Sequence, residues 1–238
     1  MKPLLFFFAL ITSLASAPLP SPAPSAPALV RIDRDNLCVT NGVVSTDSHG
    51  TLEIDTPSSR AVVRNPTAHI AEIRFRYLGP SSSSKPLASG ELRRQIGLKL
   101  RAQDTCNLLY VMWHIEPDSR IAVSIKRNPG KNTHEECGAH GYINIKPRMS
   151  VPTPRILRGD SHTLRAELHG TNLSVVADGK LVWEGPVGDE INEIDGPVGF
   201  RTDNARFAFE YYAGVPNSAS PPSERNSGVS PCHQSGGD

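Results

Sequence analysis

The sequence predicts an all-β fold, a sandwich or barrel of antiparallel strands. Apolar and polar residues alternate with a period of two over many short segments, which is typical of strands with one buried face. Sustained helical periodicity is absent, and 21 Pro and 19 Gly in 238 residues count against a helical bundle. Hydrophobic residues make up 38% of the chain, enough for one sizeable core, so we expect a single domain.

The alternation places the strands along the chain. Their apolar stripes are, in order, Ile73, Phe75 and Tyr77; Ile96, Leu98 and Leu100; Ile121, Val123 and Ile125; Leu164, Ala166 and Leu168; Leu173 and Val175; and Phe207, Phe209 and Tyr211. The run from Leu108 to Ile115 is apolar on both faces, as in a central strand that is covered on both sides. Asp178-Gly179 predicts a hairpin turn, after which Trp183 should join the core beside Leu181.

Composition divides the chain into four parts. Residues 1–15 resemble a signal peptide, with Lys2 before an apolar run, and we expect cleavage after Ala15. Cleavage after Ala17 also fits the small-residue rule, but it would leave Pro18 first. Residues 16–28 form a linker rich in Pro, Ala and Ser, residues 29–214 the folded domain, and residues 215–238 a disordered tail that contains Cys232.

The length of the apolar segments and the net charge limit the compartment and the partners that we expect. No segment after the signal reaches about 18 consecutive apolar residues, so the expected product is secreted or periplasmic, without a membrane span. Lys and Arg number 25 against 24 Asp and Glu, a net charge of +1. Such a balance does not favour recruitment by nucleic acid through a bulk electrostatic field.

Three segments of the second half carry a resemblance to a known fold family. They are 159–170 (GDSHTLRAELHG), 173–183 (LSVVADGKLVW) and 196–210, which includes GPVGFR and ARFAFE. They resemble concanavalin A-like jelly rolls, especially the laminin-G-like and bacterial keto-disaccharide-hydrolase-like branches, although Ser161 replaces the Trp that is usual there. The resemblance implies an antiparallel two-sheet jelly-roll sandwich. It does not fix an activity, because this fold hosts lectins, glycosidases, lyases and adhesion modules.

Four cysteines in an exported chain predict two disulfides, with three connectivities open. Cys106 and Cys137 flank a predicted strand hairpin, which favours a bridge between them. The resemblance implies that the first and last strands are neighbours, and this favours Cys38–Cys232 as the second bridge.

Acidic residues offer an incomplete catalytic motif. Laminarinase-type glucanases of this fold carry Glu-x-Asp-x-x-Glu on one strand, which aims the carboxylates into a groove. Here Glu53-Ile-Asp55 is followed by Ser58 at the last position, and Glu193-Ile-Asp195 by Val198. Because the second Glu is missing in both, the sequence assigns no catalytic residue, and ordinary edge or turn acids are the simpler interpretation.

Two sets of residues are candidate metal ligands. His134, Cys137 and His140 have a spacing that could hold zinc, but a disulfide at Cys137 would remove the thiolate. Oxygen ligands for calcium could come from turn residues, namely Asp33, Asp35 and Asn36 or Asp203 and Asn204. We therefore predict no cofactor and leave calcium as an option.

Cations on the polar side of the strands suggest a ligand class. The candidate ligand-binding residues are Arg74, Arg76, Lys99, Arg101, Tyr110, His114 and Lys126, and Trp113 could offer a second ring for stacking on a sugar. If these strands share a sheet, the cations line one groove and favour an acidic glycan or another anionic polymer. Alternatively, they are the usual solvent-facing residues that prevent aggregation of strand edges.

These observations lead to one functional prediction and two alternatives. The prediction is an exported, non-catalytic jelly-roll module that binds a glycan or another surface ligand. The first alternative is a glycan-active hydrolase or lyase of the keto-disaccharide-hydrolase type. It would require two groups among Glu53, Asp55, Glu135, Glu136, Glu193 and His114 to converge in a cleft. The second is a structural domain that decorates a surface complex.

Overall fold

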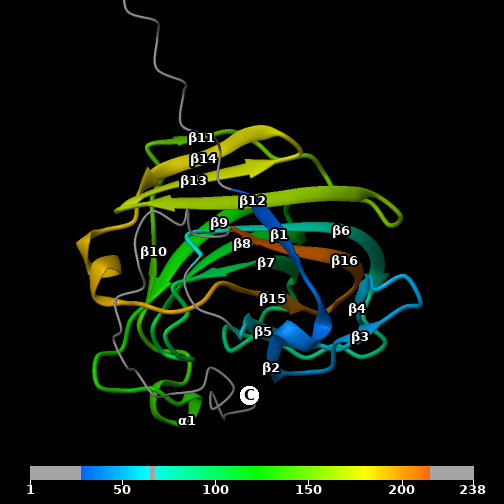
Figure 1. Ribbon diagram of the computed structural model, residues 1–238, viewed down its shortest axis with the longest axis horizontal. Helices are drawn as coiled ribbons and strands as arrows, with labels where there is room; N and C mark the ends of the chain where they lie inside the picture. The colour runs from blue at the N-terminus through cyan, green and yellow to red at the C-terminus, as the bar shows by residue number, and fades with distance from the viewer. Residues whose placement is uncertain (1–27, 65–67, 215–238) are drawn as a thin grey trace, which may run out of the picture.

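Two antiparallel sheets pack face to face in the computed structural model, which describes residues 28–64 and 68–214 (Figure 1). The nine-stranded sheet contains, in spatial order, β11 (Met149–Ser150), β14 (Lys180–Pro186), β13 (Asn172–Ala177), β12 (Ser161–His169), β6 (Ile70–Pro80), β16 (Ala205–Gly214), β4 (Leu52–Ile54) and β3 (Ser45–Thr46), with β1 (Leu29–Ile32) paired to β16.

The seven-stranded sheet contains β10 (Tyr142–Asn144), β9 (Arg120–Lys126), β8 (Leu108–Glu116), β7 (Arg94–Leu100), β15 (Gly199–Asp203), β5 (Ser58–Val63) and β2 (Leu37–Asn41). Three short helices complete the described residues: η1 (Arg34–Asn36), α1 (His134–Cys137) and η2 (Asp189–Glu193). No helix within these residues is long and apolar enough to cross a membrane.

The core lies between the sheets and is built from the predicted apolar stripes. Residues at every second position of β6, β12 and β16 are buried, since alternate side chains of a strand point to one face, whereas β7 is buried on both faces. The Phe75 ring of β6 meets the Trp113 ring of β8 edge to face at 5.8 Å, so aromatic contacts join the two layers. Because Trp113 faces this core and is fully buried, it is not a surface ring for a sugar.

Strand β8 is covered on both faces, as its sequence predicts. Leu109, Val111 and Trp113 lie in the main core, whereas Leu108 and Met112 join a smaller buried cluster on the opposite side of the seven-stranded sheet. The loops that cover this outer face therefore act as a third layer.

The predicted turn and the predicted neighbours are both present. Asp178 and Gly179 have φ values of 50° and 75° and connect β13 to β14. Strand β1 pairs with β16, so the first and last strands lie side by side. Cys38, however, lies on β2 of the other sheet, so this pairing does not support its predicted bridge to Cys232. Trp183 is buried, but the prediction for Leu181 is wrong: a register shift between Val175 and Val176 interrupts the alternation and leaves Leu181 42% exposed.

One predicted disulfide joins Cys106 and Cys137. It connects the segment before β8 to α1. No described cysteine is free, but Cys232 lies outside the described residues, so its bridge to Cys38 stays a prediction. The predicted signal peptide, the predicted tail and the predicted linker except Ala28 also lie outside them.

Candidate functional site

Six polar side chains, one from each of six adjacent strands, lie on the face of the seven-stranded sheet that points away from the core. We call this set the basic face; its members are Arg60 (β5), Arg201 (β15), Lys99 (β7), Tyr110 (β8), Lys126 (β9) and Tyr142 (β10). The registers place Arg201 opposite Arg60, Lys99 opposite Tyr110 and Lys126 opposite Tyr142. Four cations and two aromatic rings are thus brought together by strand pairing alone.

Loops wall in the basic face and form a pocket of about 280 Å³. One wall is the segment Lys85–Ala88 of the loop between β6 and β7. The opposite wall is His134, Gly138 and Ala139 at α1, which the Cys106–Cys137 bridge attaches to the sheet. Arg60, Tyr142 and Arg201 line the pocket between these walls.

Asn204 holds the first wall in place. It lies between β15 and β16 with a left-handed φ of 54°, and it is 2% exposed. Its side chain accepts a hydrogen bond from the Lys85 backbone N–H at 2.8 Å and donates to the Lys85 carbonyl at 2.9 Å and to the Arg93 carbonyl at 3.2 Å. Both ends of the loop are therefore fixed to the same residue.

One carboxylate balances part of the positive charge. Asp203 accepts hydrogen bonds from Arg201 Nε at 2.7 Å and from Gln95 Nε2 at 2.6 Å. Burial and the charges of Arg60 and Arg201 hold the pKa of Lys99 well below its usual value. The same causes lower the pKa of Lys126 to about 8. The basic face therefore carries an excess of positive charge in a poorly solvated position.

The two tyrosines form an aromatic surface beside the cations. Their rings stack with centroids 6.1 Å apart and planes inclined by 24°. The guanidinium of Arg201 lies 5.4 Å from the centroid of the Tyr110 ring, and Lys126 Nζ lies 5.2 Å from that of Tyr142. Tyr110 is buried at 4% exposure, whereas Tyr142 is 42% exposed.

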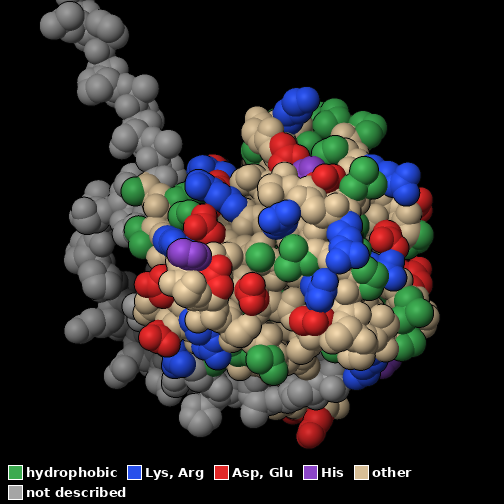
Figure 2. Space-filling view, turned by 90° about the vertical axis from the view of Figure 1, so that its right-hand side faces the viewer, with side chains coloured by type: hydrophobic (Ala, Val, Ile, Leu, Met, Phe, Trp, Pro, Cys, Tyr) green, Lys and Arg blue, Asp and Glu red, His purple; other side chains and the backbone are tan. Residues whose placement is uncertain are grey.

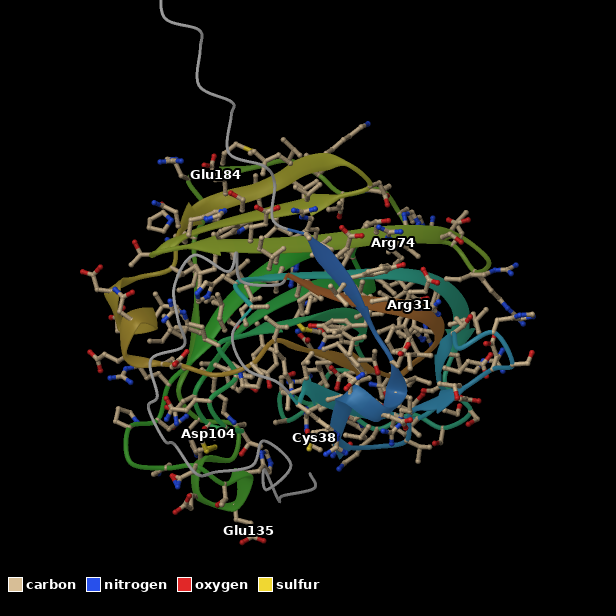
Figure 3. All side chains as sticks on the ribbon, in the orientation of Figure 1. Arg31, Cys38, Arg74, Asp104, Glu135 and Glu184 are labelled. Atoms are coloured by element: carbon tan, nitrogen blue, oxygen red, sulfur yellow. A yellow bond between two sulfur atoms is a disulfide. The ribbon has the colours of Figure 1, made fainter. Side chains whose placement is uncertain are left out.

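The structure divides the residues that the sequence grouped together. Arg74 and Arg76 lie on β6 of the nine-stranded sheet, so the condition that all the cationic strands share one sheet is not met. Figure 3 shows Arg74 near the top of the view, apart from Cys38, Asp104 and Glu135 on the side of the seven-stranded sheet. Arg74 pairs with Glu72 at 2.7 Å, and Arg76 donates to the Gly159 carbonyl at 3.3 Å.

Two further predicted residues have other roles. Arg101 follows the end of β7 with a φ of 46°, and it donates to the carbonyls of Ile191 and Ile194, which anchors η2 rather than the basic face. His114 lies on the outer face of β8 but is only 5% exposed. Its ring lies between Arg93 and Arg120, whose nitrogens are 3.4 and 3.3 Å from its own.

Lys99 and Lys126 do not fit the alternative of ordinary solvent-facing strand residues. Both are 2% exposed, because the loops of the third layer cover them. Sequence reasoning also missed Arg60, Tyr142 and Arg201. Arg60 and Arg201 each lie among apolar or small strand residues, so the same alternation could have identified them as residues of the outer face. Nothing in the sequence says that their strands lie beside Lys99.

Of the candidate catalytic acids, Glu53 and Asp55 line one cavity of about 450 Å³ at the end of β4, together with Arg76, Arg158 and Arg206. Asp55 accepts a hydrogen bond from the Ser82 backbone N–H at 2.6 Å and lies 4.0 Å from Arg206. Figure 2, which faces the side of the molecule that carries β3 and β4, shows basic and acidic side chains interspersed rather than gathered by sign.

The other candidate acids lie elsewhere. Glu193 pairs with Arg127, and Glu136 closes the capping box of α1 by accepting from the Thr133 backbone N–H. Cys137 is in the disulfide and cannot offer a thiolate to zinc. Residues 28–64 and 68–214 contain no group of three or more His, Cys, Asp and Glu that could hold a metal ion.

No protein-family model matches the sequence, and no curated protein matches it. Solved structures do match the fold. The carbohydrate-binding module CBM66 from Bacillus subtilis has a TM-score of 0.51 at 12% identity, over 73% of this chain and 91% of that one. This chain is a concanavalin A-like jelly roll.

Two further solved structures match with lower TM-scores. A Crh5 transglycosylase in complex with NAG has a TM-score of 0.49 at 12% identity, over 79% of this chain and 84% of that one. The carbohydrate recognition domain of Emp46p has a TM-score of 0.47 at 10% identity, over 76% and 89%. At such identities the likeness extends to the fold alone, so function must be argued from the basic face.

Proposed function

We propose that this chain is an exported, non-catalytic module that binds a glycan at the basic face. The observation that carries the proposal is a pocket lined by basic side chains, an exposed ring and a single carboxylate, namely Arg60, Lys85, His134, Arg201, Tyr142 and Asp203. Aromatic rings bind the apolar faces of sugars, and guanidinium or ammonium groups bind hydroxyls and acidic substituents. The fold supports the proposal, because the module from Bacillus subtilis that shares it is named as carbohydrate-binding.

The charge of the pocket favours an acidic glycan over a neutral one. Lys85 and His134 in the walls add basic groups to Arg60 and Arg201, whereas Asp203 is the only carboxylate among the lining residues of the described chain. Export is supported by the signal-like sequence of residues 1–15 and by the Cys106–Cys137 disulfide, which is typical of oxidising compartments.

The test is binding of polysaccharides that carry uronate or sulfate, against neutral polysaccharides, by calorimetry. Tyr142→Ala removes the exposed ring, and Lys85→Ser removes an exposed cation of the wall. We expect the double variant to bind at least roughly tenfold more weakly, a loss of about 1.4 kcal/mol of binding free energy, while it still unfolds in one cooperative transition. Affinity of the wild type should also fall with salt, since exposed charges are screened over about 8 Å at 0.15 M ionic strength.

The control removes positive charge from the other sheet, two charges against the one that Lys85→Ser removes. Arg74→Ser with Arg76→Ser should leave binding unchanged. If instead this control loses binding while the Tyr142 and Lys85 variant retains it, the ligand binds the nine-stranded sheet and the proposal is wrong. A turnover assay on the same polysaccharides tests the alternative of a hydrolase or lyase. Product formation that Glu53→Gln abolishes would establish that alternative.

A further inference from the structure

Lys99 differs from the other buried cations of the basic face in having no partner for its charge. Lys126 Nζ donates to the carbonyls of Thr105 at 3.0 Å and Gly138 at 2.7 Å, and Arg201 is paired with Asp203. Within the described residues, the Lys99 ammonium makes no hydrogen bond and no ion pair, although the residue is 2% exposed. A buried cation without a partner lowers the stability of the folded state.

The surroundings of Lys99 increase this cost. Arg60, Arg201 and Lys126 are close enough to repel its charge, and Asp203 is the one carboxylate that attracts it. Asp203 already accepts hydrogen bonds from Arg201 and Gln95. A protein that needed only a stable fold would gain from an apolar side chain at this position.

The sheet also brings two of the cations together. In the pairing of β7 with β15, Arg201 lies opposite Gly97 and Lys99 lies opposite Gly199. The two cations are therefore diagonal neighbours, and the two glycines occupy the other diagonal. A Cβ on Gly199 would come within 2.1 Å of the Ala61 carbonyl oxygen, so this position accepts no side chain. Diagonal neighbours on paired strands are roughly 7–8 Å apart, a spacing that one oxyanion can bridge.

We propose that Lys99, with Arg201 and Arg60, forms a subsite for a single oxyanion, the carboxylate or sulfate group of the ligand. The oxyanion supplies the negative charge and the hydrogen-bond acceptors that Lys99 lacks in the chain itself. The inference rests on the proposed function for the identity of the molecule that carries the group, whereas the subsite would also take the free ion. Lys99 is thus a binding residue that is retained at a cost to stability.

The test compares thermal unfolding of the full chain and of Lys99→Met in sodium sulfate, in sodium glucuronate and in sodium chloride at equal ionic strength. We expect the wild-type Tm to rise saturably with sulfate or glucuronate above its value in chloride. Lys99→Met should have a higher Tm than the wild type in chloride and should lose the saturable response. The oxyanion that gives the saturable rise in Tm at the lower concentration, sulfate or glucuronate, is the one that the subsite prefers.

Lys126→Met is the matched control, because it removes a buried lysine that already has two carbonyl acceptors. We expect it to lower the Tm in chloride. The inference is overturned if the wild type shows no saturable response, or if Lys99→Met lowers the Tm and keeps the response. Glycan binding that Lys99→Met leaves unchanged would overturn the subsite and leave the proposed function standing. If the wild type responds to the oxyanion but binds no glycan, the proposed function is overturned and the subsite stands.

Discussion

Buried polar residues on the outer face of the seven-stranded sheet show that strand alternation does not predict solvent exposure. On sequence alone, Lys99, His114 and Lys126 are solvent-facing residues of amphipathic strands. In the structure all three are at most 5% exposed, because loops far away in the sequence cover them. Alternation tells which face a side chain points to but not whether that face is covered, so the residues could be predicted and their environment could not.

His114 should make the protein sensitive to acid. Burial and the charges of Arg93 and Arg120 lower its pKa to about 3, against 6.5 for the unperturbed group. Between about pH 6.5 and pH 3 the unfolded state therefore binds more protons than the folded state, and stability falls as the pH falls. The slope is about 1.4 kcal/mol per pH unit for one group.

The expected outcome concerns the difference between pH 7 and pH 4 in the free energy of unfolding, measured with urea. His114→Gln, which keeps a polar amide but cannot titrate, should lose about 2–3 kcal/mol less than the wild type over this interval. Equal losses in the two proteins would show that other groups cause the acid sensitivity.

At the scale of elements, the strands could be predicted but their partners could not. Strands β6 and β7 follow one another in the chain and show the same alternation, yet they lie in different sheets. The loop between them crosses from one layer to the other, and a period of two carries no information about that crossing. For this reason the groove predicted from the sequence does not form, since it required Arg74 and Arg76 of β6 to lie on one sheet with Lys99 of β7.

The same loop gives a prediction about the wall of the pocket. Asn204→Gly removes the three hydrogen bonds to Lys85 and Arg93 and keeps the left-handed backbone, since glycine adopts a φ of 54° without strain. We expect faster amide hydrogen exchange in residues 81–93, a stability loss of about 1–3 kcal/mol and weaker ligand binding. Unchanged exchange in the loop would mean that other contacts hold the wall.

For the whole molecule, the Cys106–Cys137 bridge couples stability to the site. It joins residues 31 positions apart and fastens α1, the wall opposite the Lys85–Ala88 loop, to the start of β8. In the chain-entropy account, closing a loop of this length stabilises a protein by about 3–4 kcal/mol. The bridge therefore both limits the unfolded ensemble and fixes one side of the pocket.

Replacing both cysteines of this bridge by alanine separates the two effects. We expect the variant to lose about 3 kcal/mol of unfolding free energy in urea and, at a temperature where it is still folded, to bind the acidic glycan more weakly than the wild type does. The binding loss should come mainly from a faster off-rate, because the contacts of the basic face remain but the α1 wall is less constrained. If the folded variant binds as tightly as the wild type, α1 does not contact the ligand, and the site is confined to the sheet and the Lys85–Ala88 wall.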